Sequence, residues 1–168
     1  MATMAYIEKN GASPTETPMI KGDYGSVDAA NLNPVLNPIA PNTNSYEKWQ
    51  IWRLSSLDGA QAVDQLRFFA TAPASGWTHF YNGDVSQATY ASANHRQTSY
   101  SQPATTRTRT PASVVTSDPG QANIGIGGLL AGQLTAPGDS DYLVSQIVAG
   151  AVTSGGTLTV SFARREVA

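Results

Sequence analysis

The side chains that most often do acid–base chemistry or bind metals near neutral pH are few in this sequence. It has two histidines, His79 and His95, and no cysteine. Two histidines sixteen residues apart, with no third ligand at a matching spacing, do not predict a metal site. We interpret His79 as a packing or surface residue of a strand and His95 as part of a polar turn. The absence of thiols excludes disulfides and cysteine nucleophiles.

The carboxylates do not form a catalytic pattern either. Glycoside hydrolysis needs two carboxyl groups that face each other across a cleft, whereas the glutamates are scattered along the chain, at Glu8, Glu16, Glu47 and Glu166. The run Asp139-Ser140-Asp141 resembles a fragment of a calcium loop, but the glycine and distal glutamate of the helical calcium loop are missing. Whether this loop binds calcium stays open. We therefore predict a protein that is not an enzyme and that holds no cofactor or metal.

Composition and charge narrow the class of protein. A chain of 168 residues is long enough for one hydrophobic core without a second domain. Charged residues make up 13% and the net charge is −2, which argues against non-specific binding of nucleic acid. The sequence shows neither a signal-peptide pattern nor the ~20 consecutive apolar residues that span a bilayer. We expect synthesis in the cytoplasm and no membrane partner.

One basic segment stands out against this low charge. Arg107 and Arg109 alternate with threonines in a stretch that contains no acidic residue from Val85 to Ser117. Such a segment is either a solvated loop or a contact for an acidic neighbour, because the guanidinium group binds carboxylates well.

The pattern from residue 45 onward is one of short strands separated by turns. In the last run, Leu158, Val160 and Phe162 alternate with polar residues, as in a strand with one buried face. Turn signals such as Asp58-Gly59 and Pro137-Gly138 separate the other runs. This predicts an all-β protein, an antiparallel β-sandwich of immunoglobulin-like or jelly-roll-like type, over residues 45–168. The predicted strands are Ser45–Leu57, Asp64–Thr71, Trp77–Asn82, Val85–Ala91, Thr98–Ser101, Ser113–Thr116, Gly128–Thr135, Ser140–Ala149 and Gly156–Val167.

Residues 1–44 differ in character and predict an extended, Pro- and Asn-rich N-terminal arm. Prolines prevent long helices and weaken central strands, and they push the residue before them toward extended conformations. Residues 31–41 repeat an Asn-Pro step with apolar residues between the prolines. Such a segment is either a floppy or locally packed tail, or an arm that docks on a neighbouring subunit. The apolar residues that favour docking are Leu32, Val35, Leu36 and Ile39.

The run Ser45–Leu57 is apolar on both faces. Trp49 and Ile51 fall on one face, and Trp52 and Leu54 fall on the other. Such a strand is central and covered on both sides, or has its outer face against a partner, or contains a bulge that switches faces. The second alternative makes Trp49 and Trp52 candidate contact residues.

Several short runs together resemble small β-sandwich structural proteins encoded by tailed bacteriophages, such as capsid decoration, head-fibre or neck components. The resemblance covers roughly Ser45 to Val167. It implies a sandwich without catalytic residues, a location in the virion after assembly in the host cytoplasm, and a homo-oligomer, with a trimer as one expectation. The runs that carry it are Ser45-Tyr46-Glu47-Lys48-Trp49, Leu66-Arg67-Phe68-Phe69, Ser140-Asp141-Tyr142-Leu143-Val144-Ser145-Gln146 and Leu158-Thr159-Val160-Ser161-Phe162.

The resulting hypothesis is a non-enzymatic virion protein, foremost a capsid decoration or cement protein that binds the major capsid protein or other virion proteins through its sandwich and arm. A neck, collar or tail protein is the first alternative. The second is a carbohydrate- or receptor-binding sandwich, in which exposed aromatic side chains stack on sugars. Its candidate residues are Trp77, Tyr81, Tyr90 and Tyr100.

Overall fold

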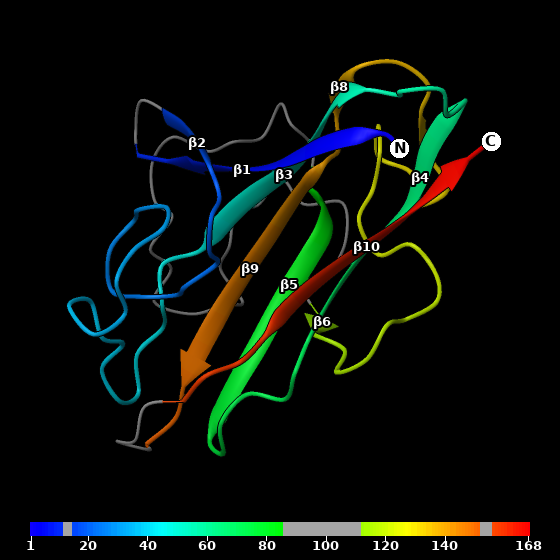
Figure 1. Ribbon diagram of the computed structural model, residues 1–168. Helices are drawn as coiled ribbons and strands as arrows, with labels where there is room; N and C mark the ends of the chain where they lie inside the picture. Colours follow the sequence, from blue (N-terminus) through cyan, green and yellow to red (C-terminus); the bar gives the residue numbers. More distant parts are fainter. Residues whose placement is uncertain (12–14, 86–111, 152–155) are drawn as a thin grey trace.

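The computed structural model describes residues 1–11, 15–85, 112–151 and 156–168. Within these ranges the chain forms two antiparallel sheets and no helix (Figure 1). This confirms the predicted all-β antiparallel sandwich. The strands are β1 (Thr3–Asn10), β2 (Thr15–Pro18), β3 (Lys48–Ser56), β4 (Ala62–Ala70), β5 (Trp77–Val85), β6 (Ala112–Ser113), β7 (Gln133–Leu134), β8 (Gly138–Asp139), β9 (Tyr142–Ala149) and β10 (Val160–Val167).

The larger sheet has the order β2-β1-β3-β9-β5-β6, with the short β8 also paired to β3. The smaller sheet has the order β10-β4-β7. In Figure 1, β10 crosses the face of the larger sheet and ends close to the start of β1. The two chain ends are joined there, because the Ala2 amide donates to Glu166 and the Arg164 guanidinium donates to the Ala2 carbonyl. Among the described residues, no helix is long and apolar enough to cross a membrane.

The main hydrophobic core fills the space between the two sheets. Trp52 and Leu143 of the larger sheet pack with Leu66 and Phe68 of the smaller one. The Phe162 ring of β10 lies 5.4 Å from the Trp52 ring and 5.5 Å from the Phe68 ring. The apolar alternation that predicted the last strand thus also places the Phe162 side chain against this core.

The opposite face of the larger sheet is apolar as well. Trp49, Ile51 and Val144 belong to a second buried cluster, in which the Trp49 ring lies 5.3 Å from the Tyr142 ring. Strand β3 therefore has the first of the three arrangements considered for it, a central strand covered on both sides. Trp49 and Trp52 belong to different clusters because they are three residues apart, and side chains an odd number of residues apart on a strand point to opposite faces.

The N-terminal region differs from the predicted arm. Residues 3–10 form β1, which lies inside the larger sheet between β2 and β3, with Ile7 opposite Ile51. The strands therefore begin well before the expected boundary at residue 45. None of the prolines of this region lies within β1, and Pro18, the last residue of β2, lies opposite Ile7. The ladder between β1 and β3 therefore contains no proline. Residues 19–44, which connect β2 to β3 and contain none of these strands, are called the strap here.

Most of the predicted strands have a counterpart. β3, β4, β5, β9 and β10 follow the predicted runs within a few residues, whereas the run Gly128–Thr135 is reduced to the two residues of β7. Turns occupy the glycine-rich part of that run. The predicted strand Thr98–Ser101 and nearly all of Val85–Ala91 lie outside the described residues.

Candidate binding surface

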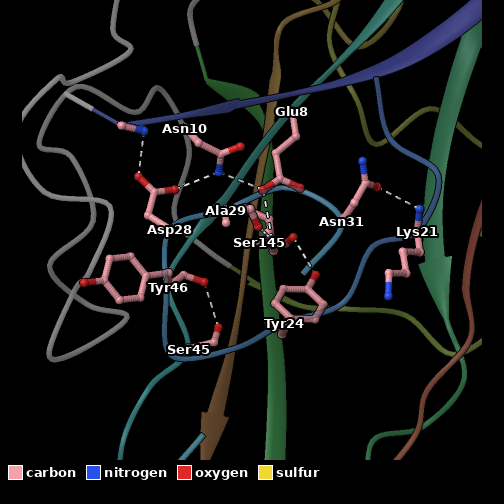
Figure 2. A network of polar contacts seen from close by, with 12 residues as sticks. Glu8, Asn10, Lys21, Tyr24, Asp28, Ala29, Asn31, Ser45, Tyr46 and Ser145 are labelled. Carbon is pink, nitrogen blue, oxygen red and sulfur yellow. Dashed lines mark hydrogen bonds and ion pairs between the residues drawn. The ribbon is translucent and has the colours of Figure 1, made fainter. Parts of the chain in front are cut away.

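The core-facing side of the larger sheet ends in a buried polar cluster, which the strap covers (Figure 2). At its centre the Lys48 ammonium donates to Glu8 Oε1 at 2.9 Å. The side chain of Lys48 is 2% exposed and that of Glu8 is fully buried. Lys48 also donates to the Ala29 carbonyl of the strap at 2.7 Å. Burial raises the pKa of Glu8 above its ordinary value, and the neighbouring Lys48 charge lowers it by less.

A second contact between sheet and strap runs through Asp28. Asn10 donates from Nδ2 to Asp28 Oδ1 at 2.7 Å, and the Gly11 amide donates to Asp28 Oδ2 at 2.8 Å. The same Asn10 nitrogen donates to Glu8 Oε1 at 2.9 Å. The Asp28 carboxylate therefore fixes the strap to the end of β1 by bonds that a solvated linker would lack.

The third contact is a chain of three side chains. The Tyr24 hydroxyl lies 2.7 Å from His79 Nε2 and 2.6 Å from Ser145 Oγ. Burial lowers the pKa of the His79 imidazole to about 4 and raises that of the Tyr24 hydroxyl. His79 is therefore neutral at physiological pH and joins β5 to the strap. This agrees with its interpretation as a packing residue.

On its outer side the strap forms a compact turn at residues 33–37. The Asn33 side chain accepts a hydrogen bond from the Val35 amide, and its carbonyl accepts bonds from the amides of Leu36 and Asn37. Asparagine favours such turns because its side chain can replace a backbone acceptor. The Asn-Pro repeat thus folds back on itself here, where an extended segment was expected. We call residues 33–37 the tip.

The tip exposes two large apolar side chains. Val35 is 83% exposed and Leu36 is 76% exposed, whereas Leu32, just before the tip, is buried and lies against Gly25. Ile20, elsewhere in the strap, is also exposed. Exposed large apolar side chains are individually common, but here the strap carries four of the seven in the described residues: Ile20, Val27, Val35 and Leu36.

The predicted contact residues therefore fall into separate groups. Val35 and Leu36 lie at the surface and Ile39 is half-buried. Trp49 and Trp52 are each 1% exposed and contact the chain's own two apolar clusters, so they are not part of its surface. Arg107 and Arg109, the predicted basic contact residues, lie outside the described residues. His95 does as well.

The aromatic residues proposed for sugar stacking do not form a described platform. Tyr81 is half-buried, and its ring lies 5.7 Å from that of Phe68 in the core. Its hydroxyl accepts a hydrogen bond from Asn123. Trp77 is half-buried at the start of β5, and Tyr90 and Tyr100 lie outside the described residues.

The acidic loop considered for calcium lines an open pocket of about 880 Å³. Asp139 is held by the Arg53 guanidinium through two bonds of 2.7 Å. Asp141 accepts a hydrogen bond from the Gly128 amide at 2.7 Å, and burial raises the pKa of its carboxyl. No group of three or more histidine, aspartate or glutamate side chains within the described ranges is placed to hold a metal ion.

Sequence reasoning missed the polar cluster under the strap. Glu8 and Asn10 share one face of β1 because they are two residues apart, but neither residue is unusual by type. Their partners come from residues 28 and 48, so no local spacing could have revealed the contacts.

Comparisons with protein-family models, with curated protein sequences and with solved structures found no match for this chain.

Proposed function

We propose that this chain is a non-enzymatic structural protein of a tailed-bacteriophage virion, and specifically a decoration or cement protein that binds the capsid lattice with the tip of its strap. The observation that carries this proposal is the exposure of Val35 and Leu36 on a turn that hydrogen bonds to Asn33 hold in shape.

The anchoring supports a binding role because it reduces the loss of entropy on docking. Tyr24, Asp28 and the Ala29 carbonyl fix the strap to the sheet, and four hydrogen bonds to Asn33 shape the tip. A loop already held in its bound shape gives up less conformational freedom when it binds. A small apolar contact of this kind is weak alone, but many copies on one lattice bind through effective concentration.

The proposal is tested by sedimentation of the purified protein with tailed-phage capsids from the same source. We expect stoichiometric binding, and we expect the double variant Val35→Ser/Leu36→Ser to lose it by about tenfold or more, the effect of about 1.4 kcal/mol. Leu129→Ser is the matched control, because Leu129 is 65% exposed but lies outside the strap. Circular dichroism should show the same fold for all three proteins.

The count of bound copies decides between sites on the virion. Hundreds of copies per particle support the shell, whereas a dozen or fewer assign the protein to the neck, collar or tail. Absence of binding to every phage particle contradicts the proposal. Equal binding by the tip variant and the wild type contradicts the role of Val35 and Leu36.

A further inference from the structure

The polar cluster under the strap places an amine and a primary amide on one carboxylate oxygen. Lys48 Nζ and Asn10 Nδ2 both donate to Glu8 Oε1, each at 2.9 Å. The two nitrogens therefore lie within about 6 Å of each other, a distance that side-chain rotation can close. The register supports this, because Lys9 pairs with Trp49 and the next residues along the two strands are Asn10 and Lys48.

We propose that Lys48 and Asn10 join in an intramolecular isopeptide bond, formed by the chain itself with Glu8 as the proton carrier. Glu8 first takes a proton from the Lys48 ammonium. The free amine attacks Asn10 Cγ, a bond forms between Nζ and Cγ, and the bond between Cγ and Nδ2 breaks. The departing nitrogen leaves as ammonium after it takes one proton from the attacking amine and one from Glu8. Glu8 returns to its carboxylate form, and no oxidant or other reactant is needed.

The surroundings of Glu8 suit this role. Its side chain is fully buried beside Lys48, and a buried carboxyl group holds a proton more readily than an exposed one. Neither Glu8 Oε2 nor Asn10 Oδ1 has a hydrogen-bond partner in the described part of the chain. A proton on Glu8 would supply the donor that these two buried acceptors lack, and a donor at Oδ1 activates the amide carbon for attack.

Two strap groups set the starting geometry. Asp28 Oδ1 accepts from the leaving nitrogen at 2.7 Å and holds the Asn10 amide in place. The Ala29 carbonyl accepts from Lys48 at 2.7 Å, so this bond must break for the amine to reach the ~3–3.5 Å needed for attack. The product would close a covalent loop from residue 10 to residue 48 that contains the whole strap. This inference does not depend on the proposed function.

The test is the intact mass of the purified full-length chain, measured when fresh and after incubation for several days. We expect a species lighter than the sequence mass by one ammonia, about 17 Da. Tryptic digestion should then give a branched peptide that joins the segment containing Asn10 to the segment containing Lys48, with no cleavage after Lys48. A chain that keeps its full mass throughout overturns the proposal.

The controls separate this bond from a side reaction with the same mass change. Asn10 precedes Gly11, and an asparagine before glycine can also lose ammonia by closing a ring on its own backbone. Lys48→Arg keeps a positive charge beside Glu8 but cannot form the bond, so it should give no branched peptide and lose less ammonia than the wild type. An equal loss in Lys48→Arg, with no branched peptide in the wild type, overturns the proposal. Glu8→Gln keeps both joined residues, and its failure to crosslink while folded would support the proton-carrier role.

Discussion

The Tyr24 hydroxyl lies 2.7 Å from His79 Nε2, and this contact joins the strap to β5, which lies between β9 and β6 in the larger sheet. The two rings also meet edge to face, with centroids 5.1 Å apart. The strap is thus held by specific polar groups of β5 and β9, His79 and Ser145.

We predict that Tyr24→Phe loosens the strap without unfolding the sandwich. The change keeps the ring but leaves Ser145 and His79 without the hydroxyl between them, which should lower the free energy of unfolding by about 1–3 kcal/mol. Urea denaturation measures this loss, and limited trypsin digestion at the exposed Lys21 should become faster. Tyr81→Phe is the control, because its hydroxyl accepts one bond away from the strap. Unchanged digestion at Lys21 would contradict the prediction.

We predict that His79 makes stability depend on pH in mildly acidic solution. Burial lowers its pKa from 6.5 to about 4 in the folded chain, so between these values the unfolded chain binds a proton that the folded chain does not. Stability conferred by neutral His79 is therefore full above pH 6.5 and decreases as the pH falls toward 4. The loss from this residue is at most about 3 kcal/mol.

The comparison of wild type with His79→Phe isolates this effect. Glu8 acts in the opposite direction, because burial raises its pKa and its folded form gains stability on protonation. Since Glu8 is present in both proteins, the difference between their unfolding free energies should shrink as the pH falls from neutral toward 4. A difference that is constant across this range would exclude His79 as the source.

We predict a small but measurable effect for the ion pairs of Arg53. This guanidinium donates to Asp139 by two bonds of 2.7 Å and also contacts Glu16 at 2.7 Å, and its side chain is 37% exposed. Arg53→Met should lower the free energy of unfolding by about 1 kcal/mol, less at high salt. Lys21→Met, which removes a single exposed pair with Asp23, should change it by nearly nothing. Equal effects of the two variants would contradict this difference.

We predict a larger loss from Phe162→Ala. The Phe162 ring lies 4.6 Å from Tyr6 and also contacts the rings of Trp52 and Phe68, so it joins both sheets. Because the side chain is half-buried, the loss should be about 2–3 kcal/mol, below the usual range for a fully buried phenylalanine. Phe69→Ala is the control, since Phe69 follows Phe68 on β4 and points to the opposite face. Thermal unfolding should show a larger decrease in Tm for Phe162→Ala than for Phe69→Ala. An equal or larger decrease for Phe69→Ala would contradict the prediction.

The sequence by itself determined the fold class and most of the strands. Alternation in Leu158, Val160 and Phe162, together with glycine and proline turns, depends on neighbours along the chain, and such local signals survive in any tertiary context.

The tertiary structure alone decided which apolar residues reach the surface. Trp49 and Val35 are both apolar in sequence, but Trp49 is enclosed by strands from both halves of the chain, whereas Val35 lies on a turn that points away from them. It also decided that residues 3–10 join the sheet, because their ladder partner begins nearly forty residues later. The contact of Lys48 with Glu8 and the strap has the same origin, since groups far apart in sequence meet only when strand pairing brings them together.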